Sequence, residues 1–373
     1  MKVLVLNAGS STLKYGFYAM PGERALASGT IEHDGTPDVA GLVGQLAEHG
    51  APDVIAHRVA HGGDRFGSAV RIDGTVLEAI RGLVPLAPLH NPANLAGIEA
   101  TMAAFPDAPQ VAVFDTAYHQ SMPEYAWRYA VPEDWLRQHG VRRYGFHGSS
   151  VGFAAAAAAQ CLGRDPADLS LVVLHLGNGA SASAVRGGRS LDTSMGLSTL
   201  DGLVMGTRCG DLDPAIPGYL ARAAGLAPAE VDRQLHQESG LLALCGDSDM
   251  RAIERRVEAG DARAELALEV FCHRARRHVG ALAATLGRLD ALVFTGGIGE
   301  HRALVRARIC AGLEVLGVGL DGNRNAQPGE LPARLDAAAS RVAVLVIATD
   351  EALQIARETM ILLGDCPGDS PQG

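Results

Sequence analysis

The chain has 373 residues, of which 47% are hydrophobic and 20% are charged, and its net charge is −10. This length exceeds that of one ordinary small domain and predicts two domains. The acidic balance argues against nucleic acid or an anionic membrane as a main partner, because a polyanion is repelled on average. The acidic net charge does not exclude a small anionic ligand, because a local cluster of arginines can bind one.

The cysteines indicate a reducing, cytoplasmic location. None of the six stands in a C-x-x-C pair, and the first 160 residues contain none. This usage favours free thiols over a disulfide framework or a zinc site. The apolar run VLVL before Asn7 is too short for a signal peptide, and no run approaches the roughly twenty apolar residues of a membrane span.

Short β-rich runs alternate with helical patterns along the chain. The expected strands are residues 2–7, 14–20, 53–59, 110–115, 171–177, 180–185, 291–297 and 341–349. The expected helices are residues 93–104, 149–162, 228–237, 249–258, 262–287, 302–316 and 350–363. Such alternation is typical of an α/β fold with a largely parallel sheet.

One sequence pattern occurs twice. VLVLNAGSST (3–12) and LVVLHLGNGASAS (171–183) each pass from a strand to a glycine with small polar neighbours, and then to another strand. Glycine turns end many strands, so the repeat is weak by itself. It suggests two similar halves, each beginning with strand, glycine turn and returning strand.

Glycine-bearing turns suggest a site for phosphate. NAGSS, HLGNGAS and FTGGIGE each follow an apolar β-rich run, and GTRCGDLDP carries Arg208. Backbone N–H groups in such turns form concavities that bind phosphate oxygens, and the helix expected after TGGIGE adds its N-terminus. Ser10 and Lys14, one of only two lysines, add donors at the first turn. Each turn is also explained as a plain hairpin, but together they favour a phosphate-handling site.

Several charged residues stand at the ends of expected strands or in loops. Arg58 lies in HRVAHGG, His90 in LAPLHNP, Asp115 in VAVFDTAYH and His147 in YGFHGSS. Strand ends are where ligands usually bind in α/β folds. The alternatives are a surface ion pair for Arg58, structural histidines, and a turn cap for Asp115.

Two adjacent acids, Asp350 and Glu351, stand at an expected strand-to-helix junction. Capping of the helix explains one of them, and a role at Mg²⁺ would explain the other.

Taken in order, these motifs resemble the acetate kinase family. The series is NAGSSTLKY, HRVAHGG, LAPLHNP, FDTAYH, YGFHGSS, HLGNGAS, DTSMG, MGTRCGDLDP, FTGGIGE and ATDE, and it spans residues 7–351. The resemblance implies a two-lobed α/β fold of the actin, hexokinase and Hsp70 type, with duplicated ribonuclease-H-like cores. It implies an N-terminal lobe of residues 1–119 plus 353–373, and a C-terminal lobe of residues 120–352 with nucleotide-binding and dimer surfaces.

The resemblance also implies an activity. The expected reaction is reversible, direct in-line transfer of the γ-phosphoryl group of ATP to acetate, which gives acetyl phosphate and ADP and serves acetyl-CoA biosynthesis. Mg²⁺ is the expected cofactor, with Mn²⁺ as the alternative. The protein is expected to be a cytoplasmic homodimer that binds acetate or another short-chain carboxylate, and neither nucleic acid nor membrane.

Site residues carry over from the family's motifs position by position. The implied catalytic residues are Arg58, Arg208, His147, Asp115 and His90. The implied acyl-substrate residues are Arg58, Ala60, Leu89, Phe146 and Thr199. The implied nucleotide-binding residues are Ser10, Lys14, His175, Asn178, Gly179, Asp249, Met250, Arg251, Gly297, Ile298, Gly299 and His301. The implied metal-binding residues are Asn7 and Glu351.

The chain departs from the family pattern at four of these positions. Ala60 stands where valine is common and Thr199 where proline is usual, so the acyl pocket is expected to be larger and propionate is an alternative substrate. One methylene is worth only about 1–3 kcal/mol of discrimination. Met250 and His301 replace an aromatic residue and an asparagine, and leave the nucleotide preference open.

The sequence alone leaves two alternative functions open. One is a non-catalytic nucleotide-binding protein of the same fold, which would be expected to have lost residues such as Arg58, Arg208, His147 or Glu351. The other is a sugar kinase that uses Asp115 as a base. The paired arginines favour a carboxylate substrate instead.

Overall fold

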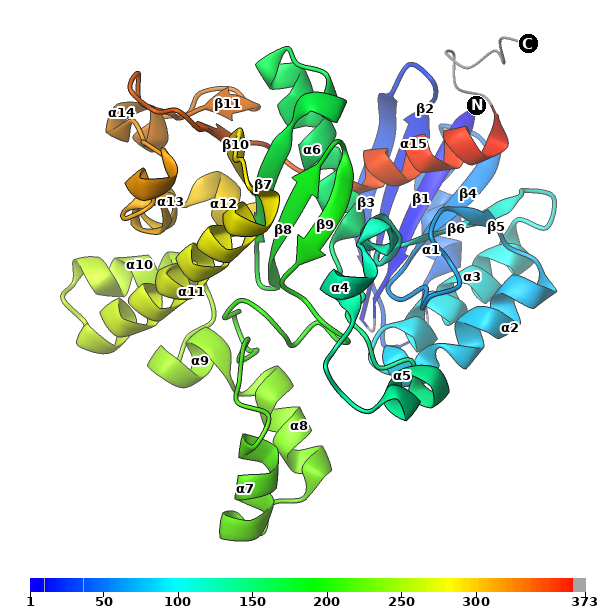
Figure 1. Ribbon diagram of the computed structural model, residues 1–373. Helices are drawn as coiled ribbons and strands as arrows, with labels where there is room; N and C mark the ends of the chain where they lie inside the picture. The colour runs from blue at the N-terminus through cyan, green and yellow to red at the C-terminus, as the bar shows by residue number, and fades with distance from the viewer. Residues whose placement is uncertain (10, 36, 365–373) are drawn as a thin grey trace. The chain divides into compact units, whose positions relative to one another are not determined.

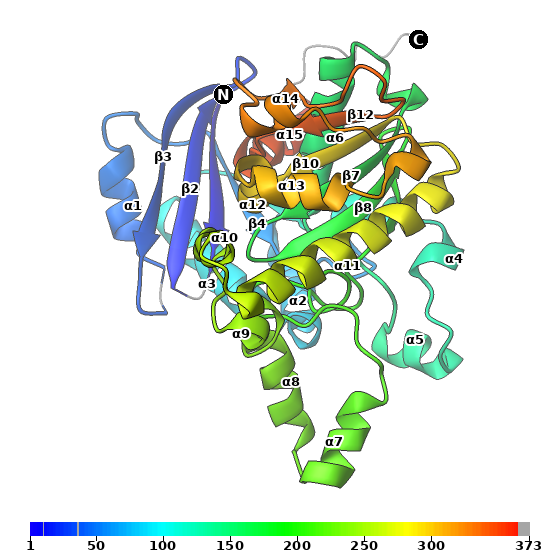
Figure 2. The ribbon, with the colours of Figure 1, turned by 90° about the vertical axis from the view of Figure 1, so that its left-hand side faces the viewer.

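The computed structural model describes residues 1–9, 11–35 and 37–364. The chain forms two compact units, each built on a six-stranded sheet (Figures 1 and 2). Unit 1 comprises Met1–Gln120, Gly148–Ser150 and the chain from Asp350 onward; unit 2 comprises Ser121–His147 and Val151–Thr349. The lobe limits implied by the resemblance, 1–119 plus 353–373 and 120–352, stay a prediction.

The sheet of unit 1 has the strand order β3-β2-β1-β4-β6-β5. Its strands are β1 (Lys2–Ala8), β2 (Thr12–Ala19), β3 (Arg24–Glu32), β4 (Val54–Val59), β5 (Val70–Arg71) and β6 (Gln110–Phe114). The first three form an antiparallel meander, β4 and β6 continue parallel to β1, and β5 is antiparallel to β6.

The sheet of unit 2 repeats this topology, with the order β11-β12-β10-β7-β8-β9. Its strands are β7 (Ser170–Leu176), β8 (Ala180–Arg186), β9 (Arg189–Thr193), β10 (Ala291–Thr295), β11 (Ala333–Arg334) and β12 (Ala343–Val346). Again a three-stranded antiparallel meander is followed by two parallel strands and an antiparallel edge strand. The duplicated α/β fold expected from the repeated sequence pattern is confirmed.

Each unit also contains helices. Those of unit 1 are α1 (Val39–Leu46), α2 (Gly74–Gly82), α3 (Asn91–Ala104) and α15 (Glu351–Leu363). The helix α6 (Gly148–Leu162) begins in unit 1 and continues in unit 2. The others belong to unit 2: α4 (Glu124–Trp127), α5 (Glu133–His139), α7 (Ile216–Ala224), α8 (Pro228–Gln237), α9 (Gly240–Cys245), α10 (Met250–Glu258), α11 (Ala262–Leu286), α12 (Gly296–His301), α13 (Ala303–Cys310) and α14 (Gly322–Ala326).

The two faces of the unit 1 sheet carry separate cores. Val3 and Val5 pack on one face with Ile355 of α15, whereas Leu4 and Leu6 pack on the other face in the cluster that holds α1. This alternation is the two-residue period of a strand buried on both sides. It fixes the direction in which each residue at the end of β1 points.

In unit 2 the long helix α11 lies along the sheet (Figure 1). Its buried residues Leu268, Phe271 and Cys272 join Val172 and Leu174 of β7 in one large core. Removal of this apolar surface from water, at about 25 cal/mol per Å², is the main stabilising contribution of such a face.

Three expected elements end two or more residues earlier than the sequence suggested, and glycine explains two of them. The third, the expected strand 341–349, ends at Val346. The expected strand 291–297 stops at Thr295 because Gly296 has a left-handed backbone, with φ of 77°, and a Cβ there would lie 2.7 Å from the carbonyl oxygen of Leu176. The expected helix 302–316 divides into α13 and a 3₁₀ turn, Glu314–Leu316, around Gly312, whose φ is 91°. L-amino acids with a side chain disfavour both conformations.

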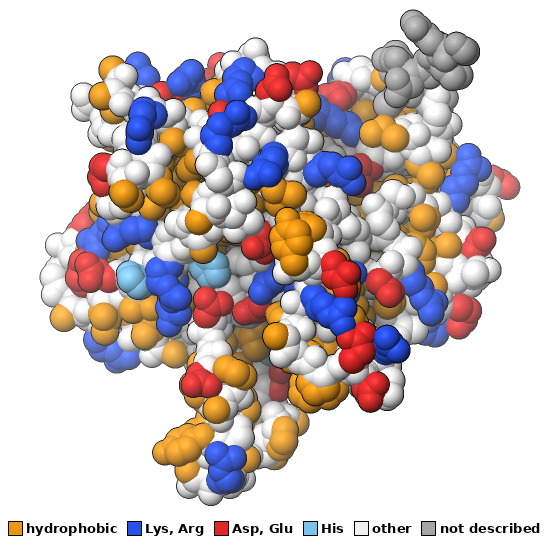
Figure 3. Space-filling model, viewed as in Figure 1, with side chains coloured by type: hydrophobic (Ala, Val, Ile, Leu, Met, Phe, Trp, Pro, Cys, Tyr) orange, Lys and Arg blue, Asp and Glu red, His pale blue; other side chains and the backbone are white. Residues whose placement is uncertain are grey.

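Basic and acidic side chains are interspersed on the face of the molecule seen in Figure 3. Many form local ion pairs, such as Arg233 with Glu230 and Glu238 on and beside α8. Within the part of the chain that the structure describes, no helix is long and apolar enough to cross a membrane.

His57 is a buried polar residue in the centre of unit 1. Its side chain is 2% exposed, and Nε2 lies 2.7 Å from Gln110 Oε1 and 3.3 Å from Thr101 Oγ1. Burial lowers the pKa of His57 to about 4, against the hydrogen bond with Gln110, which acts to raise it. The imidazole is therefore neutral in the folded protein at neutral pH.

Stability is expected to fall as the pH is lowered below 6.5. The unfolded state then takes up a proton on His57 that the folded state excludes down to about pH 4, and this difference amounts to about 2 kcal/mol between pH 7 and pH 5. Urea unfolding of the wild type and of His57→Gln, whose amide does not titrate, measures the effect at each pH. Equal pH dependence in the two proteins would contradict the prediction.

Candidate active site

Three polar residues end three neighbouring parallel strands of unit 1. Leu6 pairs with His57 between β1 and β4, so Asn7 and Arg58 follow at the same end of the sheet; Asp115 directly follows β6. By strand alternation, all three share the face of Val5, Ala56 and Val113, which is the face covered by α15. The carboxyl ends of parallel strands are the usual position of ligand sites.

Arg58 is held between two carboxylates at this end of the sheet. Its Nη2 donates to Asp115 Oδ2 at 2.9 Å, and its Nε lies 3.7 Å from Glu351 Oε2. The Arg58 side chain is only 19% exposed. Burial alone would lower the pKa of the guanidinium, but Asp115 and Glu351 hold that pKa above its ordinary value.

The two acids at the start of α15 have different roles. Asp350 is the N-cap: its Oδ1 accepts from Leu353 N at 2.8 Å and from Tyr18 OH at 3.1 Å. Capping therefore accounts for Asp350, as one of the alternatives predicted. Glu351 instead directs its carboxylate towards Arg58, beyond hydrogen-bonding distance.

The first glycine turn is the β1–β2 hairpin. Asn7 pairs with Lys14 in its register, and Gly9 N donates to the carbonyl oxygen of Thr12 at 2.8 Å. Directly paired residues of an antiparallel ladder share a face, so Lys14 lies on the same face as Asn7, with an exposed side chain. Ser10, the other predicted ligand of this turn, lies outside the described residues.

The remaining predicted residues of unit 1 differ in exposure. Ala60 is 5% exposed, and its backbone N–H donates to Asn94 Oδ1 at 2.9 Å. Leu89 is 57% exposed, and the exposed His90 stands at the N-cap position of α3. Ala60 therefore has a fixed position within unit 1, whereas Leu89 is available for contact.

In unit 2, two predicted histidines lie together on one face of the sheet. The ring centroids of His147 and His175 are 4.2 Å apart, and His147 Nδ1 lies 2.9 Å from Ser181 Oγ. Ser181 is opposite His175 in the β7–β8 ladder. His147 has a left-handed backbone with φ of 60° at the start of α6. This conformation is uncommon for a residue with a side chain and often marks a functional position.

Gly179 lies beside both His147 and Arg208. A Cβ on Gly179 would be 3.4 Å from Arg208 Nη1 and 3.4 Å from His147 Nε2. Arg208 Nη1 also donates to the carbonyl oxygen of Thr199 at 3.3 Å, and burial lowers the pKa of this guanidinium. A guanidinium, an imidazole and a residue without a side chain thus meet at the turn that follows β7. Phe146, the remaining predicted acyl residue of this unit, is 3% exposed.

A cavity of about 440 Å³ opens beside the same turn of unit 2. It is lined by seven of the predicted nucleotide residues: Asn178, Asp249, Met250, Arg251, Gly297, Ile298 and His301. Its size falls within the range of small-molecule sites. Gly299 is not among the residues that line it: this residue is buried in α12, and its carbonyl oxygen accepts from Arg306 Nη1.

Sequence reasoning did not identify several residues of these clusters. Gly177, Ser248 and Arg302 also line the cavity, and Ser181 orients His147. Gly177 and Ser181 belong to the motif HLGNGAS, so their place in it was an available signal. No pattern in the sequence marks Ser248 or Arg302.

The two sheets of one topology define a duplicated α/β fold, and comparison with known proteins identifies the family. The acetokinase family profile matches residues 45–357. The acetate kinase of Streptomyces avermitilis is 49% identical, over 97% of this chain and 98% of that protein. The chain belongs to the acetokinase family.

Solved structures agree with this assignment. The acetate kinase of Porphyromonas gingivalis has a TM-score of 0.90 and 38% identity, and the comparison covers 97% of this chain and 99% of that one. A propionate kinase of Francisella tularensis also has a TM-score of 0.90, with 39% identity over 96% and 98% of the two chains.

Gly179→Ala is expected to lower the rate of phosphoryl transfer by roughly 100-fold, because a methyl group would enter the space between Arg208 and His147. The matched control is Gly280→Ala in α11, where a Cβ meets nothing within 4 Å. The control should keep full activity and gain up to about 1 kcal/mol of stability. Steady-state kinetics and thermal unfolding check both variants, and an active Gly179→Ala enzyme would contradict the prediction.

Proposed function

We propose that the protein is an acetate kinase that transfers the γ-phosphoryl group of ATP to the carboxylate of acetate, reversibly and by direct in-line displacement. The products are acetyl phosphate and ADP. Membership of the acetokinase family supports the reaction class. The observation that carries the residue assignment is the Arg58 guanidinium, held by Asp115 and Glu351 at the end of the unit 1 sheet.

The acceptor explains why arginine is needed. Acetate is fully ionised at neutral pH and needs no base to attack phosphorus. The barrier comes instead from bringing two anions together. A planar guanidinium binds a carboxylate or a phosphoryl group with two parallel hydrogen bonds. Arg58 Nη2 donates to Asp115, and this hydrogen bond orients the guanidinium. Because Nε makes no hydrogen bond to Glu351, Arg58 retains donors for a substrate anion.

The ion pair also bears on the rival sugar kinase. There Asp115 would have to accept a proton from a hydroxyl group. In the structure its Oδ2 accepts from Arg58 at 2.9 Å, which favours a role in orienting the arginine. Retention of Arg58, Arg208, His147 and Glu351 likewise favours an enzyme over a non-catalytic nucleotide-binding protein.

We assign stabilisation of the transferring phosphoryl group to His147, Arg208 and the turn at Gly179. Negative charge on its equatorial oxygens is best met by donors that are already oriented. Ser181 fixes one nitrogen of His147, which leaves Nε2 directed towards the Gly179 side. His90 is assigned to the same reaction from unit 1.

Mg²⁺ fits the oxygen donors at the end of β1. Asn7 offers an amide oxygen on the face covered by α15, and the Glu351 carboxylate forms no hydrogen bond to Arg58 at 3.7 Å. Mg²⁺ prefers oxygen ligands and commonly uses one or two protein groups while it keeps several waters. When bound, it would neutralise charge on the ATP phosphates. Mn²⁺ is the alternative ion.

We assign the cavity beside the β7–β8 turn to the nucleoside part of ATP. Its lining combines apolar surface from Met250 and Ile298 with polar groups from Asn178, Asp249 and Arg251. Arg251 and Asp249 form an ion pair at 2.8 Å at the rim. His175 and Lys14 are assigned to the phosphates.

The setting and assembly follow the same proposal. The described cysteines are all free, which supports a reducing, cytoplasmic location. The helices α7 and α8 form a hairpin that extends from the rest of unit 2 (Figures 1 and 2), and Tyr219 on α7 is 60% exposed. These features support a homodimer formed through unit 2.

Arg58→Ala is expected to lower kcat by about three orders of magnitude, because it removes the oriented cation that opposes anion repulsion. Arg58→Lys should recover only part of the rate, since lysine lacks the planar donor pair. Arg81→Ala is the matched control: Arg81 makes exposed ion pairs with Glu78 and Glu99 in the same unit, and its loss should leave kcat unchanged. Near-normal turnover by Arg58→Ala would overturn the assignment.

An acyl phosphate trap tests the substrate. Purified protein with ATP, Mg²⁺ and hydroxylamine is given acetate, propionate, butyrate or glycerol, and acyl hydroxamate is measured. Acetate is expected to give the highest rate. A preference for propionate would assign a widened pocket to Ala60 and Thr199. No hydroxamate from any acid, with ATP still bound, would support a non-catalytic nucleotide-binding protein.

A further inference from the structure

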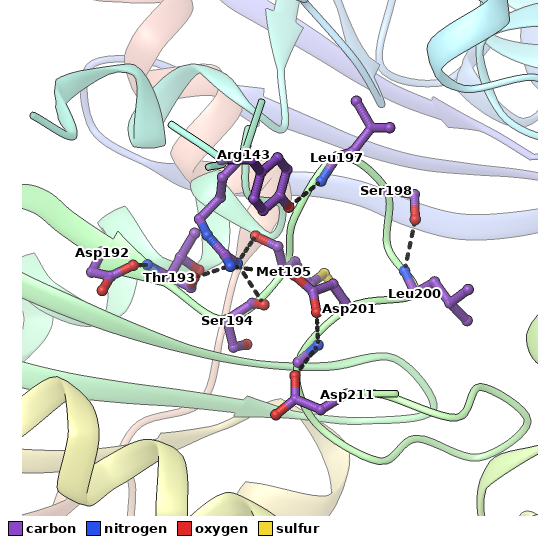
Figure 4. Close-up of polar contacts among 12 residues, drawn as sticks. Arg143, Asp192, Thr193, Ser194, Met195, Leu197, Ser198, Leu200, Asp201 and Asp211 are labelled. Atoms are coloured by element: carbon purple, nitrogen blue, oxygen red, sulfur yellow. Dashed lines mark hydrogen bonds and ion pairs between the residues drawn. The ribbon is translucent and has the colours of Figure 1, made fainter. Parts of the chain in front are cut away.

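Arg143 connects two segments of unit 2 that are far apart in the sequence. Its Nη1 lies 2.9, 2.8 and 2.9 Å from the carbonyl oxygens of Thr193, Ser194 and Met195 (Figure 4). Its Nη2 lies 3.3 Å from Asp201 Oδ2. Arg143 also precedes Phe146 and His147 by only a few residues. One guanidinium therefore joins the loop between α5 and α6, which carries these two assigned site residues, to both ends of the segment 193–201.

A second anchor holds the middle of this segment. Leu197 N donates to Tyr129 OH at 3.1 Å, and Arg143 Cζ lies 5.6 Å from the centre of the Tyr129 ring. Asp201 Oδ1 and Asp211 Oδ1 both accept from Gly202 N, at 3.1 and 3.2 Å (Figure 4). The backbone is thus fixed at Leu197 and again at Asp201.

Thr199 lies midway between these two anchors. Ser198 and Leu200 flank it, and Leu200 N donates to Ser198 Oγ at 3.2 Å, which closes a tight turn. The carbonyl oxygen of Thr199 accepts from Arg208 Nη1 at 3.3 Å. Displacement of the anchors would therefore move both an assigned acyl-pocket residue and the guanidinium of Arg208.

We propose that Arg143 is a positioning residue that sets the acyl-chain preference of the enzyme, acting through Asp201 and the Tyr129 hydroxyl on the backbone of residues 197–201. The proposal rests on the assignment of Thr199 to the acyl pocket. A pocket distinguishes acids that differ by one methylene only while its wall stays in place, and one methylene corresponds to roughly 10–200-fold in kcat/KM. The Arg143 anchors hold that wall.

The charges around Asp201 are consistent with such a role. Burial raises the pKa of Asp201, whereas Arg143 acts to lower it. Asp211 lies on the far side of Gly202 and is itself paired with His278, 3.0 Å from Nε2. The arginine is therefore the cation that balances a half-buried carboxylate next to the turn.

Two substitutions each weaken one of the anchors. Tyr129→Phe removes the hydroxyl that binds Leu197 and Asp201, and keeps the ring beside Arg143. Arg143→Lys keeps the charge but not the planar set of donors. The matched control is Arg256→Lys, because Arg256 is also a half-buried arginine of unit 2 that pairs with an aspartate, Asp261, and donates to a carbonyl oxygen, that of Cys245.

The measurement is kcat/KM for acetate, propionate and butyrate, together with the KM for ATP and thermal unfolding. Both variants are expected to raise the propionate-to-acetate ratio of kcat/KM by about tenfold, with the KM for ATP within twofold of wild type. Arg256→Lys should leave the ratio unchanged. A wild-type protein without acyl phosphate formation would contradict the proposed function itself, which is a distinguishable outcome.

The proposal is overturned if the ratio stays constant in folded Tyr129→Phe, or if kinetic constants for acids and ATP fall together. Should Arg143→Lys fail to fold, Tyr129→Phe decides alone. The double variant Arg143→Lys/Thr199→Ala adds an independent check. Its propionate-to-acetate ratio of kcat/KM should change by less than the product of the changes in Arg143→Lys and Thr199→Ala. The reason is that the effects of residues that act through one another are not additive. A strictly multiplicative result would contradict the proposed route.

Discussion

The ion cluster of Arg58, Asp115 and Glu351 is the interaction on which the arrangement of unit 1 depends. The three residues come from β4, the end of β6 and the first turn of α15, so they meet only when the parallel register and the docking of α15 are both correct. A buried charge without its partner is strongly unfavourable, whereas a complete pair contributes little net stability over apolar residues of the same size. The main effect of the cluster is thus to select one strand register, and its contribution to the net stability of the fold is small.

A different constraint operates in unit 2, where the backbone is restricted instead. His147 adopts a left-handed conformation at the first residue before α6, and Gly179 has no side chain where the imidazole and Arg208 approach. The imidazole of His147 and the missing side chain of Gly179 together create a space that is bordered by hydrogen-bond donors. The same sheet topology therefore supports two unlike sets of groups: carboxylates around an arginine in one unit, and imidazoles with an arginine in the other.

The sequence predicted the central strands because they are buried on both faces and read as continuous apolar runs, as in LVVLHL of β7. It did not predict β3 or β9. The first, RALASGTIE, has little β-branched or alternating apolar character, and the second, RSLDT, is short and polar. Their hydrogen bonds to β2 and β8 decide their structure. Likewise α12, GGIGEH, forms despite three glycines of poor helix propensity.

The site was predicted unevenly for a similar reason. Residues in dense motifs, such as Arg58, Asp115 and His147, were recognisable, whereas the contacts that orient them were not. The pairing of Arg143 with Asp201 joins positions without any shared pattern, and the choice between capping and ligand binding for Asp350 and Glu351 required atomic positions.

The discontinuity of unit 1 has a consequence for the order of synthesis on the ribosome. Val3 and Val5 need Ile355, Ala356 and Met360 of α15 to cover their face of the sheet, and this helix is translated after the whole of unit 2. Unit 2, which ends at Thr349, can complete its core before the N-terminal unit does. The usual N-to-C order of domain folding is thereby reversed, and an apolar sheet face stays uncovered until unit 2 has been synthesised. Truncation before α15 would leave that face permanently exposed to chaperones and to aggregation.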